Sequence, residues 1–190
     1  DTAAVAAEVG RLVAVEPIHV LVHNAGYADD APFVGMTREQ WTGVVDVILN
    51  GFFNVTQPLL MPMIRARFGR IINVVSIAAL AGNRGQTNYA AAKAGLAAAA
   101  KSLAQEVARK GITVNNVAPG IIDTPIWGKI PAGAQRNGAN APIDPEERAR
   151  LATPLGRAGQ ASEIASGVLY LASDASLPLE RLPNYDRLVT

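Results

Sequence analysis

The feature that most constrains the fold of this chain is a run of β-branched residues within residues 70–76. The run shows no regular alternation with polar residues, and its apolar members are Ile71, Ile72, Val74 and Val75. Such a run is typical of a strand buried on both faces, as in parallel sheets that are covered by helices on each side. Shorter apolar segments at residues 18–22 and 112–118 predict two further strands, the first of them also buried.

Helical patterns separate the predicted strands. They cover residues 2–15, 37–64, 87–110, a short segment after Asp144, and about residues 161–172. Strands that alternate with helices imply right-handed crossovers, so we expect an α/β fold with a Rossmann-like, doubly wound parallel sheet. Ligands bind such sheets at the carboxyl ends of the strands. This rule selects three loops, at residues 23–27, 76–86 and 119–125.

The second predicted helix has a clear beginning and an irregular second half. Thr37 and Gln40 have the residue types and the spacing of a capping box, in which side chains bond the free backbone N–H groups of the first turn. Pro58 and Pro62 lack the backbone N–H that a helix interior requires, so they should kink or break the helix.

Composition excludes several functional classes. The formal net charge is +1 and 17% of the residues are charged, so no basic surface for nucleic acid or an anionic membrane is expected. No stretch is apolar over the roughly 18 residues of a membrane span, and no signal peptide is recognisable, so we expect a cytoplasmic protein. No metal is expected, because the chain has no cysteine and its only histidines, His19 and His23, lie too close together in an apolar strand.

Tyr89 and Lys93 indicate the chemistry. They are four residues apart in the alanine-rich helix and therefore share a face, while Ser76 ends the preceding strand. An ammonium group beside a phenol favours the phenolate and lowers the tyrosine pKa from about 10 towards neutral, where proton exchange with a carbonyl oxygen is efficient. Taken alone, a Tyr-x-x-x-Lys pair is more often an ordinary solvated pair on a helix.

Four segments in a fixed order favour a catalytic Tyr–Lys pair over an ordinary solvated one. They are residues 23–26, Ser76, residues 88–95 and residues 115–124. Together they resemble the short-chain dehydrogenase/reductase family, and the resemblance extends to about Asp174. Ser76 precedes Tyr89 by thirteen residues, and residues 82–89 resemble the 3-oxoacyl-[acyl-carrier-protein] reductase branch most closely. The resemblance implies an oxidoreductase that uses NADP(H) or NAD(H), with NADP(H) slightly preferred.

The resemblance also implies roles for individual residues. Tyr89 protonates the carbonyl oxygen, Ser76 hydrogen-bonds that oxygen, and Lys93 lowers the tyrosine pKa and binds the nicotinamide ribose. The expected cofactor-binding residues are Asn24, Ala25, Gly26, Tyr89, Lys93, Pro119, Gly120, Ile122 and Thr124. A simpler interpretation of residues 24–26 and of Thr124 is that they only form turns. His23 is interpreted as a residue for packing or backbone contact, not for catalysis.

The chain departs from the family pattern at Ile48 and at both ends. Ile48 stands where the family usually carries a catalytic asparagine that holds a water in the proton relay, and Asn50 would face away unless the helix is bulged there. No glycine-rich strand-to-helix turn precedes His23, so the first strands and the cradle for the cofactor pyrophosphate are expected to be missing. We therefore expect residues 1–190 to form one partial Rossmann-like domain, with residues 175–190 as an atypical tail that lacks the final strand.

Two functions remain open. The first is reduction of a carbonyl, expected in a 3-oxoacyl thioester or a related small molecule, to an alcohol by hydride from NAD(P)H, with Tyr89 as general acid. The second is a catalytically weak or inactive module that associates through its helices. The helices at about 37–67 and 87–110 are expected to pair across subunits of a homodimer or homotetramer, with residues 97–100 permitting close approach. Residues 126–141, rich in Gly, Pro and Asn, predict a mobile loop over the substrate.

Overall fold

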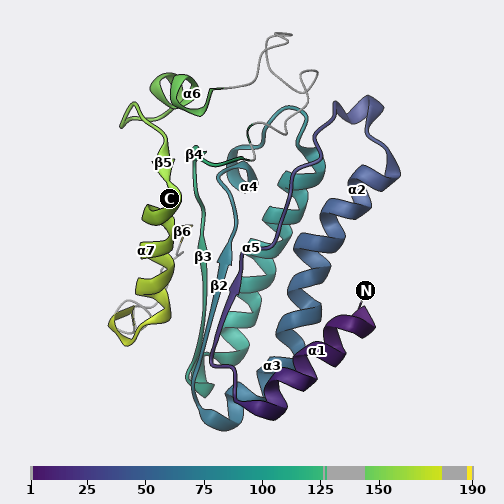
Figure 1. Ribbon diagram of the computed structural model, residues 1–190, viewed down its shortest axis with the longest axis vertical. Coiled ribbons are helices and arrows are strands. Elements are labelled where there is room, and N and C mark those ends of the chain that lie inside the picture. The colour runs from purple at the N-terminus through teal and green to yellow at the C-terminus, as the bar shows by residue number, and fades with distance from the viewer. Residues whose placement is uncertain (1, 126, 128–143, 177–187, 190) are drawn as a thin grey trace.

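The computed structural model describes residues 2–125, 127, 144–176 and 188–189 and has an α/β architecture (Figure 1). The central sheet is parallel, with the strand order β1-β2-β3-β6. Its strands are β1 (Val20–His23), β2 (Gly69–Val74), β3 (Ile112–Val117) and β6 (Leu188–Val189). A small parallel sheet joins β4 (Ile122–Asp123) and β5 (Gly159–Gln160). The predicted class, a partial Rossmann-like α/β fold with a parallel sheet, is confirmed.

Helices lie on both faces of the central sheet, as Figure 1 shows. One face is covered by α1 (Thr2–Val15), α5 (Thr87–Val107) and a long helix that consists of α2 (Arg38–Val45), η2 (Asp46–Asn50) and α3 (Gly51–Ala66). The other face is covered by α7 (Ala161–Ala172). The shorter helices are η1 (Phe33–Gly35), α4 (Ala78–Ala81), η3 (Ala108–Lys110), α6 (Pro145–Ala152) and η6 (Asp174–Ser176).

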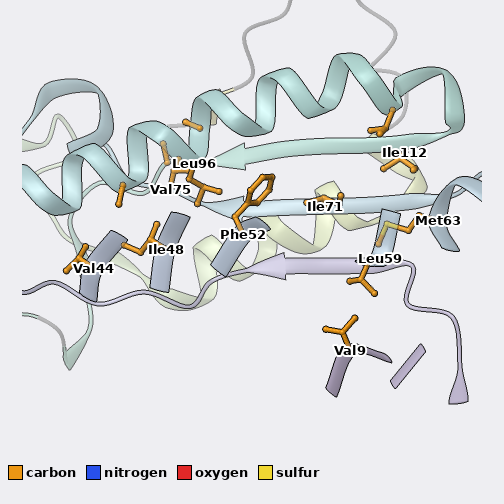
Figure 2. Packing of buried hydrophobic residues seen from close by; sticks show 14 residues of the cluster. Val9, Val44, Ile48, Phe52, Leu59, Met63, Ile71, Val75, Leu96 and Ile112 are labelled. Carbon is orange, nitrogen blue, oxygen red and sulfur yellow. The ribbon is translucent and has the colours of Figure 1, made fainter. Parts of the chain in front are cut away.

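The β-branched run in β2 packs against the helices on both faces of the sheet. Successive side chains of a strand point to opposite faces of the sheet. Ile71 packs in the larger core cluster with the long helix, α1 and α5 (Figure 2), whereas Ile72 packs with Leu171 of α7. Both isoleucines are fully buried. A strand between two helical layers therefore needs apolar residues at consecutive positions, as the sequence predicts.

The strand β1 is more exposed than predicted. It begins two residues later than expected, and its residues alternate between exposed and half-buried, with Val20 43% and Val22 41% exposed. Among the described residues β1 pairs only with β2, so it forms an edge of the sheet. The prediction of a buried strand at residues 18–22 is wrong because nothing in the described part of the chain covers the outer side of this strand.

The irregular turn of the long helix lies where the sequence left a bulge open, and the two prolines do not end the helix. Pro58 and Pro62 do not break it, since α3 continues through both. The residue after each proline, Leu59 and Met63, is buried in the core, and this burial offsets much of the roughly 3 kcal/mol that an interior proline costs. The irregularity is instead η2, a turn of π-helix. The predicted capping box at Thr37 is confirmed.

The long helix corrects the expectation that no stretch is apolar over the roughly 18 residues of a membrane span. The continuous segment Arg38–Ala66 is long and apolar enough, by length and composition alone, to cross a bilayer. Core helices of α/β domains pass the same test. One stripe of this helix packs in the larger core cluster with α1, α5 and β2 (Figure 2), through Val44, Ile48, Phe52, Leu59 and Met63. We therefore treat it as a core helix of the domain.

The remaining predicted helices are confirmed. α5 ends through η3 at Gly111, which has a φ of 78°, the left-handed conformation expected of a terminating glycine. The side chain of Asp144 caps α6, and α7 covers the predicted residues. No strand is predicted in the tail, but the structure has the strand β6 there, which pairs with β3. The expected mobile loop at 126–141, except Trp127, and residues 177–187 lie outside the described residues.

Candidate active site

The three loops selected from the sequence follow β1, β2 and β3 and meet at the carboxyl edge of the sheet. The loops after β2 and β3 are joined by a 3.1 Å hydrogen bond from the Ile77 N–H to the Pro119 carbonyl. The loop after β1 approaches the long helix and α5. A Cβ atom on Gly26 would lie 3.4 Å from Ile48 Cγ1 and 3.5 Å from Lys93 Nζ. The expected residues 24–26 are exposed here, next to Lys93.

Lys93 is buried and held by the backbone of β2. Its side chain comes from α5, and Nζ donates a 2.6 Å hydrogen bond to the carbonyl oxygen of Val74. Only 3% of the residue is exposed, and this burial lowers the pKa of Lys93 to about 8. Burial disfavours the charged form of a lysine, so the ammonium becomes a readier proton donor than a solvated one.

Tyr89 lies one turn before Lys93 on α5 and contacts Ser76. Burial raises the pKa of Tyr89, a hydrogen bond with the Ser76 side chain opposes that shift, and the Asp30 carboxylate adds to it. The net shift of the tyrosine pKa is therefore opposite to the predicted lowering, because burial and the Asp30 carboxylate outweigh the Ser76 hydrogen bond. The ammonium lies over the tyrosine ring, 5.7 Å from its centroid, and is bonded to the Val74 carbonyl. Burial thus favours the protonated form of Tyr89, which is the form a general acid requires.

The relay position is filled by a hydrocarbon side chain. Ile48 lies in η2, is 3% exposed, and faces Gly26 and Lys93. The bulge that the sequence left open is present, yet it does not bring Asn50 to the site. Asn50 is exposed and its amide donates a 2.6 Å hydrogen bond to Asp46. Neither residue can therefore hold a water beside Lys93 in the way that the family asparagine is expected to do.

His23 has the packing role expected of it. Its Nε2 forms a 2.8 Å hydrogen bond with Thr56 Oγ1, and its ring lies 5.2 Å from that of Phe52. Burial, helped by the nearby Lys93 ammonium, lowers the pKa of His23 to about 4. The imidazole is therefore neutral at physiological pH, and its ring fixes the end of β1.

The segment after β3 contributes the remaining expected residues. Gly120 is exposed and a Cβ there would meet no atom within 4 Å. Ile122 lies in β4, and its carbonyl oxygen accepts a 2.6 Å hydrogen bond from the indole N–H of Trp127. Thr124 is half-buried, and its carbonyl accepts a bond from the Trp127 backbone. These residues lie in the loop after β3, which is joined to the loop that carries Ser76.

Sequence patterns missed Asn88, which orients the start of α5. Its side chain is fully buried, and its amide donates to the carbonyl oxygens of Asp29, at 3.0 Å, and Gln40, at 2.9 Å. Its own amide oxygen accepts from the Tyr89 N–H at 2.8 Å. One side chain thus ties the loop after β1, the helix α2 and Tyr89 together. An asparagine directly before the tyrosine in an alanine-rich helix is the only sequence signal for this role.

A parallel α/β sheet with Ser76 just after the end of β2, and with Tyr89 and Lys93 four residues apart on α5, is the arrangement of a short-chain dehydrogenase/reductase. The family model described as enoyl-(acyl carrier protein) reductase matches residues 1–178, and the chain belongs to this family. The predicted membership is confirmed.

Similar proteins support the branch suggested by the sequence. The chain is 46% identical over 159 residues to the 3-oxoacyl-[acyl-carrier-protein] reductase FabG of Thermotoga maritima, a match that covers 84% of this chain and 60% of that protein. It is 43% identical over 160 residues to nodulation protein G of Rhizobium meliloti, covering 84% and 61%. It is 46% identical over 158 residues to the acetoacetyl-CoA reductase of Shinella zoogloeoides, covering 83% and 61%. The chain thus spans about three fifths of the length of these relatives.

The described residues fit one half of a nicotinamide cofactor. A Cβ on Gly26 would lie 3.5 Å from Lys93 Nζ, so the glycine keeps a side chain away from the ammonium on the side where a ribose hydroxyl could approach it. Ammonium groups are donors only, which suits hydroxyl acceptors. For the pyrophosphate, the described residues contain no glycine-rich turn between a strand and a helix ahead of β1. The donor chemistry of the described residues is therefore compatible with the nicotinamide ribose.

Proposed function

We propose that this chain is the proton-transfer part of an NAD(P)H-dependent oxidoreductase that reduces the carbonyl of a 3-oxoacyl thioester. One observation carries the proposal: Tyr89 is largely buried, forms a hydrogen bond with Ser76, and has the Lys93 ammonium over its ring. A neutral phenol next to a hydroxyl is suited to bind and protonate a carbonyl oxygen. An ordinary solvated Tyr–Lys pair would have neither the burial nor the serine.

The proposed mechanism assigns one task to each side chain. The Ser76 hydroxyl donates a hydrogen bond to the substrate carbonyl oxygen and so positions it. Tyr89 then gives its proton to that oxygen as negative charge develops there. The phenolate that remains is stabilised by the Lys93 ammonium. A bound nicotinamide cofactor supplies the hydride that adds to the carbonyl carbon.

The residues that would hold the cofactor are those expected from the family. Lys93 and Tyr89 would bind the ribose of the nicotinamide, and residues 24–26 would line the adenosine side. Pro119, Gly120, Ile122 and Thr124 would line the nicotinamide itself, with backbone groups of Ile122 meeting the carboxamide. Preference for NADP(H) over NAD(H) stays a prediction.

The substrate class is inferred from the printed names of relatives. A 3-oxoacyl-[acyl-carrier-protein] and acetoacetyl-CoA are both 3-oxoacyl thioesters, which supports this class for the present chain. The carrier of the acyl group is left open by these names. The location in the cytoplasm also remains a prediction.

A second function, an association module with weak or no activity, is favoured by Ile48 beside Lys93. The long helix offers a surface for it, because Phe53 and Met61 are 64% and 53% exposed. Residues 97–100 supply less of that surface than predicted, since Ala97 and Ala100 are buried within the chain itself. The same helices would form the homodimer or homotetramer of the whole enzyme, so an assembly alone does not separate the two functions.

The reaction is tested by incubating the protein with NADPH or NADH and acetoacetyl-CoA. We expect loss of the cofactor absorbance and formation of 3-hydroxybutyryl-CoA, identified by mass. Crotonyl-CoA is the matched control, because it has a double bond in place of the ketone and should not be reduced. Reduction of crotonyl-CoA alone, or of neither thioester, would reject the proposed reaction.

A further inference from the structure

Asp30 is a buried carboxyl close to the candidate site that the proposed mechanism does not use. It lies in the loop after β1 and is only 5% exposed. The side-chain amide of Gln86 donates a 2.8 Å hydrogen bond to Oδ2. The other oxygen, Oδ1, is buried without a hydrogen-bond partner. A buried carboxylate oxygen without a donor is costly, so its retention points to a use.

The contacts of Asp30 lead directly to the segment that carries Tyr89. Gln86 is the residue before α5, and its carbonyl accepts a 2.8 Å hydrogen bond from the Ala90 N–H. Next to Asp30, the Ala31 N–H donates to the Gly85 carbonyl at 2.9 Å. The loop after β1 is therefore fastened at two neighbouring points to the turn that begins α5.

The charges around Asp30 and Tyr89 come from few groups. Burial raises the pKa of Asp30, the bond from Gln86 opposes the shift, and the Asp29 carboxylate adds to it. Asp30 in turn raises the pKa of Tyr89. On α5 the Lys93 ammonium lies over the tyrosine ring, and α2 contributes the neutral Gln40, which is bonded to Asp29. Among these charged groups, only Asp30 raises the proton affinity of the tyrosine.

We propose that Asp30 is a positioning residue for Tyr89: through its hydrogen bond with Gln86 it holds the turn before α5, and it places a buried carboxylate near the tyrosine hydroxyl. The proposal rests on the proposed role of Tyr89, and it adds Asp30 as a further residue that influences ionisation of the tyrosine hydroxyl. Burial of the phenol and the Asp30 charge both raise the pKa of Tyr89, whereas the Ser76 hydrogen bond lowers it. The acidic side chain thus makes Tyr89 an acid rather than a ready phenolate.

The test is a spectroscopic titration of tyrosinate absorbance in the folded chain without cofactor or substrate. The signal of Tyr89 is isolated by subtracting the titration of a Tyr89→Phe variant made in the same background. We expect Asp30→Asn and Asp30→Ala to shift the ionisation of Tyr89 to lower pH, since both remove the charge. Only Asp30→Ala should also lower the thermal unfolding midpoint, because the asparagine keeps an oxygen for Gln86.

Asp29→Asn is the matched control, since it removes the same charge from the neighbouring residue and should leave the Tyr89 titration in place. An unshifted titration in both Asp30 variants, or an equal shift in Asp29→Asn, overturns the proposal. Circular dichroism at each pH ensures that folded protein is compared. Because no turnover is measured, a shift in a protein that reduces no thioester would reject the proposed function while supporting the role of Asp30.

Discussion

The Lys93 ammonium donates a 2.6 Å hydrogen bond to the carbonyl oxygen of Val74, the last residue of β2. This bond connects the middle of α5 to the strand that leads into Ser76. It also directs the ammonium over the ring of Tyr89, 5.7 Å from the centroid, rather than leaving it in solvent. The site therefore combines a lysine whose pKa is lowered by burial with a tyrosine whose pKa is raised by it.

The lowered pKa of Lys93 predicts how stability depends on pH. The folded pKa is about 8 against an ordinary value of 10.5, so between these values the unfolded chain binds more protons than the folded one. The contribution of this group to the free energy of unfolding then rises with pH across that window, by an amount on the order of 3 kcal/mol. Lys93→Met should lack this rise, as measured by urea unfolding between pH 7 and about 10. Parallel pH profiles for the two proteins would contradict the prediction.

Replacing Ile48 by asparagine should lower the stability of the protein and raise its activity. The side chain is 3% exposed and lies next to Lys93, so a buried amide with incomplete hydrogen bonding costs about 1–3 kcal/mol in the free energy of unfolding. The amide would also offer a site for a relay water beside the ammonium. We expect Ile48→Asn to lower the thermal midpoint and to raise kcat several-fold in the acetoacetyl-CoA assay.

Two variants control for this change. Val44→Asn places the same amide in the same helix at a fully buried position and should lower stability without raising kcat. Asn50→Ala should alter neither, because that side chain is exposed and bonded to Asp46. If kcat rises equally in Val44→Asn, or falls in Asn50→Ala, the relay position has been assigned to the wrong residue.

Asn88→Ala should be strongly destabilising. The substitution leaves the carbonyls of Asp29 and Gln40 without this donor and frees the Tyr89 N–H. Each buried group left unsatisfied costs about 1–3 kcal/mol, so a loss of about 2 kcal/mol or more is expected in urea unfolding. The exposed Asn50→Ala should stay within about 0.5 kcal/mol of the unchanged protein. A similarly small effect of Asn88→Ala would show that the network does not hold α5.

Cofactor binding by residues 1–190 is expected to be weak. The described residues offer Lys93, Tyr89 and residues 24–26 to the nicotinamide and ribose, while β1 is an edge strand with no glycine-rich turn before it in the described chain. Titration of NADPH fluorescence with the protein should show no saturation in the micromolar range. Micromolar or tighter binding would mean that other residues cradle the pyrophosphate.

The sequence predicts much of the fold because its strongest patterns are local. The β-branched run in β2, the alanine-rich α5 and the capping box at Thr37 each determine their own element. Errors occur where tertiary packing decides. The prolines in α3 are tolerated because the side chains beside them are buried, and β1 is exposed because its neighbours in the described chain cover one side only.

The candidate site, like the fold, is predictable only where local spacing determines it. Helical spacing places Tyr89 and Lys93 together, and the strand end places Ser76 near them. Spacing says nothing about where an ammonium points or how deeply a phenol is buried, so neither the bond from Lys93 to Val74 nor the rise of the tyrosine pKa by burial is predictable. Asp30 and Asn88 act across loops that are distant in sequence, and only the structure reveals their contacts.

The most direct test of the central claim compares the unchanged protein with Tyr89→Phe in the reduction of acetoacetyl-CoA at millimolar NADPH. The variant removes one hydroxyl and keeps the ring under Lys93, so folding, measured by circular dichroism, should be unchanged. We expect kcat/KM to fall by about 100-fold or more, the usual contribution of a general acid. Equal rates for the two proteins would contradict the assignment of Tyr89 as the residue that protonates the carbonyl oxygen.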